Sequence, residues 1–249
     1  MPVTIHLVRH AQGVHNLSRA HEAIHDPDLT ELGKQQCAEL RDKFPHHRKL
    51  TCLFASPLRR AVQTCLLSFG NDFNAEPHYR KGIVALPDFQ EVSESPCDTG
   101  SDREVLDEEF KDLINLGFVK SGWNVVSQYA NWDAKVQDLQ ARAVRARMQL
   151  QELTRQMGED EHIALVTHGA FVHFLTGDYD GIPAGRGWEN TEFRSYHLTG
   201  SSESDLSLVE TEESWERRKG LTHRVTKTDQ DALREKYLQE LECILMPRS

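Results

Sequence analysis

Three short apolar runs in this chain each end in a polar cluster, and helix-like segments lie between them. The runs are VTIHLVRH from residue 3, LTCLFASPLRR from residue 50 and HIALVTHG from residue 162. A continuous apolar run of this length is typical of a strand buried on both faces, as in a parallel sheet. Strands that alternate with helices therefore predict an α/β fold, with a mostly parallel central sheet and helices on both faces in three layers.

The rest of the chain adds further strands and helices to this pattern. We expect helices over residues 28–44, 57–69, 132–157 and 228–245, and further strands over 81–89, 193–198 and 205–210. Residues 1–200 are predicted to form one catalytic domain, in which 91–131 is a helical and loop insertion over the active-site edge. Residues 201–249 are predicted to be a polar segment and a C-terminal helix that packs on, or trails, the same domain. Within it, TEESWERRKG at 211–220 is expected to be a solvated linker.

Composition excludes several classes of protein. The formal net charge is −10, which argues against a general nucleic-acid binder because such proteins need clustered Lys and Arg. No apolar run approaches the about 18 residues that a membrane span needs. The five cysteines are odd in number and lack CxxC spacing, so neither a disulfide framework nor a zinc knuckle is expected. The N-terminus lacks the pattern of a signal peptide, and we expect a cytoplasmic protein.

The residues that follow the buried strands have the chemistry to bind an anion. Arg9 and His10 follow the first run, an arginine pair follows the second, and His168 follows the run that starts at residue 162. In open α/β sheets, ligands bind outside the carboxyl ends of the strands, so these side chains should meet at one edge. Arginine offers a fixed fork of donors to phosphate, and a neutral imidazole can attack phosphorus.

At this point the sequence resembles a known family. LVRHAQGVHN, ASPLRRAVQT and LVTHGA are similar, in order and spacing, to the motifs of the histidine phosphatase superfamily, phosphoglycerate-mutase-like branch. The resemblance covers roughly residues 3–200. Ala11 and Gln12 stand where the family usually has Gly and Glu. Gly169 rather than Asp follows the second histidine, which separates the chain from the acid-phosphatase and phytase branch.

The resemblance implies a role for each matching residue. His10 would take the phosphoryl group and become phosphohistidine, with His168 beside it. The residues that would hold the substrate phosphate are Arg9, Asn16, Arg59, His168 and Gly169. Arg59 rather than Arg60 matches the family motif, so Arg60 is expected to face solvent.

The same resemblance places the general acid after the strand at 81–89, in an L-x-E pattern. Phe89-Gln90-Glu91 fits with Phe for Leu, so Glu91 is the predicted acid, and Glu94 and Asp88 remain alternatives. A proton donor must be neutral at the working pH, which requires a raised pKa.

These observations favour a metal-independent phosphatase that acts on a small-molecule phosphate ester and needs no cofactor. A mutase of this family carries a Y-G-x-x-x-G type segment after the acid, whereas here VSESPCDTGSDREV follows it. The alternatives are a phosphoglycerate-mutase-like phosphotransferase and a non-catalytic protein that binds a phosphate ligand. His21 and His25 have the i, i+4 spacing that metal ligands can have, but a surface segment is the preferred interpretation.

Overall fold

The computed structural model describes residues 2–73, 82–125, 129–158, 160–180, 188–219 and 224–245. Within them one sheet has the strand order β4-β3-β2-β5-β1-β6-β7. Its strands are β1 (Thr4–Arg9), β2 (Leu50–Ala55), β3 (Ile83–Ala85), β4 (Ile114–Asn115), β5 (His162–Thr167), β6 (Phe193–Thr199) and β7 (Ser207–Glu210). The pairs formed by β1 to β5 are parallel, whereas β6 pairs antiparallel with β1 and with β7. The predicted α/β fold with a mostly parallel sheet is confirmed.

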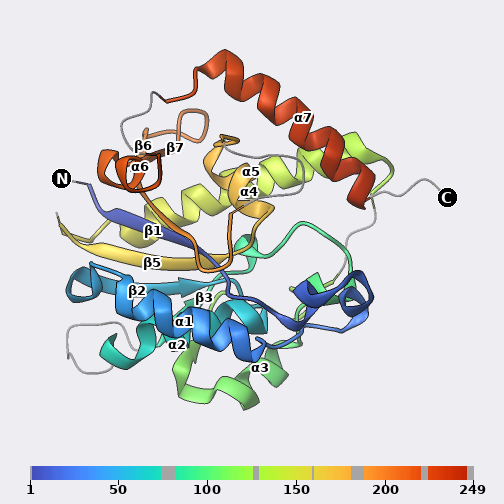
Figure 1. Ribbon diagram of the computed structural model, residues 1–249, viewed down its shortest axis with the longest axis vertical. Helices are drawn as coiled ribbons and strands as arrows, with labels where there is room; N and C mark the ends of the chain where they lie inside the picture. Colours follow the sequence, from blue (N-terminus) through green and yellow to red (C-terminus); the bar gives the residue numbers. More distant parts are fainter. Residues whose placement is uncertain are drawn as a thin grey trace.

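Helices cover both faces of this sheet. They are α1 (Glu31–Lys43), α2 (Arg59–Phe73), α3 (Arg103–Phe110), α4 (Trp132–Thr154), α5 (Phe171–Thr176), α6 (Glu212–Lys219) and α7 (Lys227–Leu245). In Figure 1, α1, α2 and α3 lie below the strands β1, β2 and β5, and α4, α5 and α7 lie above them. Successive strand residues point to opposite faces, so Leu7 and Val8 of β1 belong to two different hydrophobic clusters, one on each side.

The segment after β3 contributes to the sheet as well as covering its edge. It contains α3 and the two-residue edge strand β4, whose Ile114 pairs with Ile83. Two residues are too few to show the alternation by which a strand is detected in sequence, so only a helical and loop insertion was predicted here.

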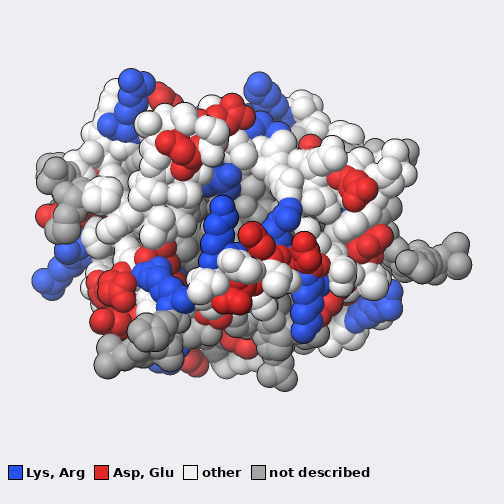
Figure 2. All heavy atoms as spheres, turned by 90° about the horizontal axis from the view of Figure 1, so that it is seen from above, with Lys and Arg blue, Asp and Glu red and all other residues white. Residues whose placement is uncertain are grey.

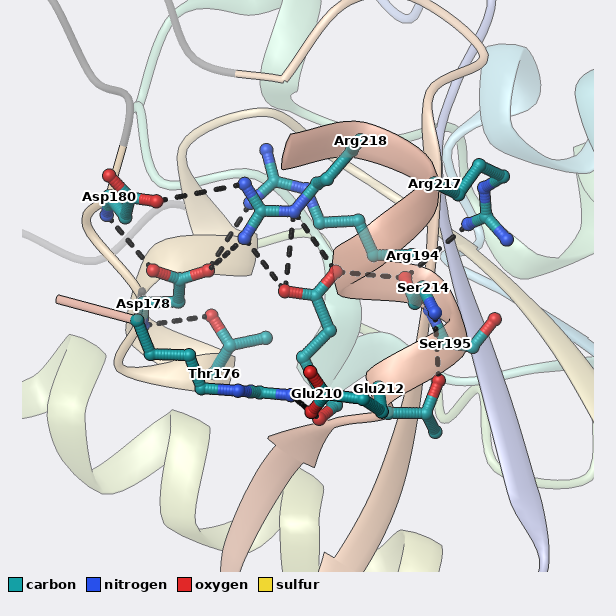
Figure 3. Close-up of polar contacts among 12 residues, drawn as sticks. Thr176, Asp178, Asp180, Arg194, Ser195, Glu210, Glu212, Ser214, Arg217 and Arg218 are labelled. Atoms are coloured by element: carbon teal, nitrogen blue, oxygen red, sulfur yellow. Dashed lines mark hydrogen bonds and ion pairs between the residues drawn. The ribbon is translucent and has the colours of Figure 1, made fainter. Parts of the chain in front are cut away.

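The segment predicted as a solvated linker at 211–220 contains a packed helix, α6, and this prediction is wrong. Trp215 of α6 is only 5% exposed. Figure 3 shows the ion network that connects α6 to the sheet. Arg218 pairs with Glu210 at 2.7 Å and with Asp178 at 3.2 Å, and Arg194 of β6 pairs with the same Asp178 at 3.3 Å. Because this helix is packed by ion pairs and by a single tryptophan, it lacks the apolar periodicity that reveals most helices.

The C-terminal helix α7 packs on the face formed by α4 and α5. Leu241 is buried in the hydrophobic cluster of that face, and Tyr237 and Leu238 pack against it. Figure 2 views the molecule from this side, where Lys and Arg alternate with Asp and Glu. None of the helices in the described ranges is long and apolar enough to cross a membrane.

Candidate active site

The carboxyl ends of β1, β2 and β5 bring the predicted polar residues together. β1 and β5 are neighbours in register, with Arg9 opposite Thr167, so the two histidines that follow these strands leave the sheet side by side. The backbone N–H of His10 donates to the carbonyl of Thr167 at 2.9 Å. The rings of His10 and His168 lie 5.1 Å apart, centroid to centroid.

The hydrogen bonds of His10 fix its tautomer and place the lone pair of the ring on Nε2. Its Nδ1 lies 2.7 Å from the carbonyl oxygen of Ala11. A carbonyl oxygen only accepts, so Nδ1 carries the proton and Nε2 carries the lone pair. The Nε–H of Arg60 donates to that lone pair at 3.3 Å. Burial, and next the charge of Arg60, hold the pKa of His10 well below its ordinary value, so the ring is neutral at pH 7.

The arginine that meets the two histidines is Arg60, which corrects the prediction from the sequence. Arg60 was expected to face solvent, but it is 0% exposed. Its Nη2 lies 3.2 Å from Nδ1 of His168, and its Nη1 donates to the carbonyl of Cys97 at 2.5 Å. The side chain of Arg59 is 27% exposed and forms ion pairs with Asp28 and Glu109 at the surface.

The phase of α2 explains which arginine turns inward. Side chains four residues apart share a face of a helix, and Arg60, Thr64 and Ser68 are all 0% exposed. Thr64 donates to the carbonyl of Arg60 at 2.7 Å and accepts from the backbone N–H of Ala11 at 3.0 Å. The four-residue spacing of these three positions, next to the apolar face of the helix, could have predicted their burial. Because all three are polar, they were not counted with the buried face.

His168 is completely buried behind His10. Its Nδ1 accepts from the guanidinium of Arg60, so in the neutral ring Nε2 carries the proton and donates to Ser56 Oγ at 2.8 Å. The pKa of His168 is well below its ordinary value, because the ring is buried and because Arg60 is close. The predicted pairing of two histidines is therefore present, with one arginine in contact with both.

Arg9 and Gly169 lie in contact at the end of the sheet. A Cβ atom at residue 169 would lie 3.0 Å from Nε of Arg9, so glycine leaves room for this guanidinium. Nη1 of Arg9 donates to the carbonyl of Trp188. The ring of Trp188 stacks under the guanidinium of Arg194, 4.3 Å from the ring centroid, which links Arg9 to the ion network of Figure 3.

Of the three candidate acids, Glu91 is the one that accepts from the backbone segment just after His168. Its Oε2 accepts from the N–H of Ala170 at 3.1 Å, and its Oε1 accepts from that of Phe171 at 3.0 Å, both at the start of α5. Burial, and next the charge of Asp98, raise the pKa of Glu91. By contrast, Asp88 pairs with Arg145 at 3.4 Å. Glu94 pairs with the buried Lys135.

A cavity of about 480 Å³ opens over these residues. Its floor includes Arg9, His10 and Glu91. Asn16 lines it too, and its Oδ1 accepts from the N–H of Gly13 at 3.0 Å. The walls are formed by His15, Asn16, Arg19 and Glu22 on one side, by Ser93, Glu94, Ser95, Cys97 and Asp98 on another, and by Ile244 and Leu245 of α7.

Three further residues orient the site, and of their surroundings the sequence indicated only the segment at 96–102 as a candidate pocket rim. Asp98 pairs with Arg60 at 2.7 Å, and the side chain of Asn190 donates to the carbonyl of His10 at 2.8 Å. Arg142 of α4 donates to the carbonyl of Glu91. None of the three stands beside a motif in the chain, so only folding places them near the strand ends.

The remaining histidine prediction concerned a possible metal pair. His25 is exposed, and Nδ1 of His21 is hydrogen-bonded to Ser18 Oγ at 2.7 Å. Over the described ranges, no cluster of three or more His, Cys, Asp or Glu has the arrangement to hold a metal ion.

Comparison with known proteins assigns the family. Residues 5–203 match the model of the histidine phosphatase superfamily (branch 1). The chain belongs to this superfamily. A phosphoglycerate mutase-like protein of Arabidopsis thaliana is 29% identical to this histidine phosphatase superfamily member over 207 residues, which cover 71% of this chain and 74% of that protein. A second Arabidopsis protein, phosphoglycerate mutase-like protein 1, is 28% identical over 205 residues, covering 68% of this chain and 69% of that protein.

Two solved structures show how far the fold extends along the chain. The ecdysone phosphate phosphatase of Bombix mori aligns with a TM-score of 0.57 at 12% identity, over 93% of this chain and 99% of that one. A mycobacterial glucosyl-3-phosphoglycerate phosphatase aligns with a TM-score of 0.51 at 16% identity, over 84% of this chain and 97% of that one. The TM-scores show a common fold. The sequence identities are too low to indicate the substrate of this family member.

Proposed function

We propose that this histidine phosphatase superfamily member is a metal-independent phosphatase, which hydrolyses a small-molecule phosphate ester through a phosphohistidine at His10. One observation carries the proposal. At a single pocket, a neutral imidazole accepts from a buried arginine through its Nε2 lone pair, and a carboxyl group with a raised pKa lies on the same floor. These groups can serve as the nucleophile, the cation that stabilises the phosphoryl oxygens and the proton donor of a phosphoryl transfer.

In the first step, Nε2 of His10 attacks phosphorus and the bond from phosphorus to the leaving oxygen breaks. Arg9, Arg60 and His168 stabilise the charge that spreads over the phosphoryl oxygens. Glu91 gives its proton to the leaving oxygen, so the alcohol departs neutral. Arrival of the dianion raises the pKa of Glu91 further and raises that of His168 from its lowered value, because negative charge close to a carboxyl or an imidazole favours its protonated form.

In the second step, water attacks the phosphohistidine. Glu91, now a carboxylate, takes a proton from the water, the bond between phosphorus and Nε2 breaks, and inorganic phosphate is released. His10 recovers its lone pair and Glu91 recovers its proton, so the cycle closes without any other reactant.

The walls of the pocket favour hydrolysis over the mutase alternative. Among the described lining residues away from the floor, Arg19 is the one cation, and Glu22, Glu94 and Asp98 are acidic, of which Glu94 pairs with Lys135 and Asp98 with Arg60. A phosphoglycerate carries a carboxylate beside its phosphate, and an acidic wall repels it. Ile244 and Leu245 instead offer an apolar surface to the leaving group. The proposed nucleophile, arginine and acid lie together at one site, which supports a catalytic role over the non-catalytic alternative.

The proposed function is tested with three phosphate esters, of which glycerol 3-phosphate and 3-phosphoglycerate are similar in size. We expect release of inorganic phosphate from p-nitrophenyl phosphate and glycerol 3-phosphate, more slowly from 3-phosphoglycerate, and unchanged rates after exhaustive chelation with EDTA. The arginines already neutralise the phosphate charge that a metal would otherwise neutralise. Loss of activity on chelation that one added metal restores would contradict the metal-independent mechanism. Interconversion of phosphoglycerates without phosphate release would support the mutase instead.

Substitution of Glu91 should give a defect that depends on the leaving group. Loss of a general acid costs about 10²- to 10⁴-fold in rate. An alkoxide leaves poorly without a proton, whereas p-nitrophenolate is stable. We therefore expect Glu91→Gln to lower kcat/KM strongly for an alkyl phosphate and much less for p-nitrophenyl phosphate. Asp88→Asn and Glu94→Gln are the matched controls. If either control shows the selective defect and Glu91→Gln does not, the acid is misassigned.

A further inference from the structure

A buried arginine that does not line the cavity contacts the main chain of Glu91. Arg142 of α4 is 8% exposed, and its two terminal nitrogens donate to the main-chain carbonyl of Glu91 at 3.2 and 3.1 Å. Its Nε is buried without a hydrogen-bond partner, and in the described ranges no carboxylate forms an ion pair with it. A neutral carbonyl compensates poorly for burying a guanidinium charge, so the charge is costly where it stands.

The same guanidinium touches the second residue that holds the carboxyl group. It stacks over the ring of Phe171, 4.3 Å from the ring centroid. The backbone N–H of Phe171 donates to Oε1 of Glu91 at 3.0 Å. Arg142 thus contacts the main chain of the acid and also the residue whose N–H orients its carboxylate.

We propose that Arg142 is a positioning residue for Glu91: it fixes the carboxyl group against the start of α5, and its charge helps the acid to release its proton. The inference rests on the proposed function, because it requires Glu91 to be the proton donor. A misplacement of about 1 Å in a reacting group can cost on the order of a hundredfold in rate. A buried positive charge close to a carboxyl also stabilises its ionised form.

Other charges act on Glu91 from the elements packed around it. Burial and Asp98 raise its pKa, while Arg60 and Arg9 lower it. From α7, the phenol of Tyr237 lies 3.4 Å from the carbonyl of Ala170 and stays neutral, because burial holds its pKa well above the ordinary value. Arg142 is an additional cation beside this carboxyl that lies outside the pocket, so it can be changed without touching the substrate phosphate.

The test compares two arginines of α4. Arg147 also donates to main-chain carbonyls, those of Phe174 and Leu175, but it does not contact Glu91. We expect Arg142→Met to lower kcat/KM for an alkyl phosphate about 10- to 100-fold, and to lower it much less for p-nitrophenyl phosphate. Arg147→Met should lower both by the same small factor. Thermal unfolding of each variant reports any loss of stability separately.

The pH profile separates the charge of Arg142 from its geometry. Activity falls as pH rises through the pKa of the acid, so removal of the cation should move this basic limb to higher pH in Arg142→Met. Arg142→Lys keeps the charge and loses the two-pronged hydrogen bond, so its basic limb should stay near that of the parent protein while the alkyl phosphate rate still falls. If Arg142→Met does not fold, Arg142→Lys is measured alone. A selective loss with the alkyl phosphate then supports the positioning role, and an equal loss with both substrates overturns it.

Glu91→Gln, measured alongside, separates failure of this inference from failure of the proposed function. Equal loss with both substrates in the Arg142 variants, or an unchanged basic limb in Arg142→Met, would overturn the positioning role while the selective defect of Glu91→Gln stands. If Glu91→Gln itself shows no selectivity for the leaving group, the assignment of the acid fails, and the inference fails with it.

Discussion

Replacement of His10 by alanine is expected to lower turnover by at least about 10⁴-fold, because loss of a nucleophile removes the covalent route entirely. The neutral imidazole of His168 also accepts from Arg60, but His168 is completely buried and does not line the cavity, so His10 is the imidazole that a substrate can reach. His15 is the natural control, since its ring lies 5.4 Å from that of His10 and lines the same cavity. We expect a far smaller loss for His15→Ala.

The covalent intermediate provides the direct measurement for this prediction. Denaturation in alkali after mixing with labelled substrate should preserve phosphohistidine and place the label on the peptide that contains His10. The label should be absent from His10→Ala and present in His15→Ala. Full activity of His10→Ala, or label on another residue in the parent protein, would contradict the mechanism.

Replacement of Arg60 is expected to have the second largest effect, and replacement of its neighbour Arg59 almost none. An arginine that stabilises a transferring phosphoryl group is worth about 10³- to 10⁵-fold in rate. Arg60 contacts both histidines, so Arg60→Ala should lose activity on that scale with every leaving group. Arg59 forms surface ion pairs, which contribute at most about 1 kcal/mol to stability, and we expect it to contribute nothing to the reaction.

Chemical rescue distinguishes a role in the reaction from a role in folding. Added guanidinium ion should restore part of the activity of Arg60→Ala, and Arg60→Lys should recover less than the parent protein because an ammonium lacks the fork of donors. Thermal unfolding of both alanine variants serves as the folding control. A severe loss in Arg59→Ala with an active Arg60→Ala would show that the motif alignment, rather than the geometry, identifies the arginine that binds the phosphate.

Much of the fold could be predicted because its signals are local. The apolar runs of β1, β2 and β5 and the long helix α4 have periods that a few consecutive residues reveal. The strand β4 and the helix α6 were missed for the opposite reason. The former is stabilised by pairing with β3 and the latter by ion pairs from Arg218 to residues 178 and 210, and neither leaves a pattern in its own segment.

The sequence by itself determined the family, the parallel sheet and the histidines at the strand ends, because each follows from residues that are consecutive in the chain. Only the tertiary structure decided which of two adjacent arginines meets His10, since that depends on the phase of α2 against the sheet. It also placed Arg142 against the main chain of Glu91, 51 positions away in the chain. The physical reason is the same in both cases: hydrogen bonds between distant side chains depend on how whole helices pack, and that packing is a property of the folded molecule.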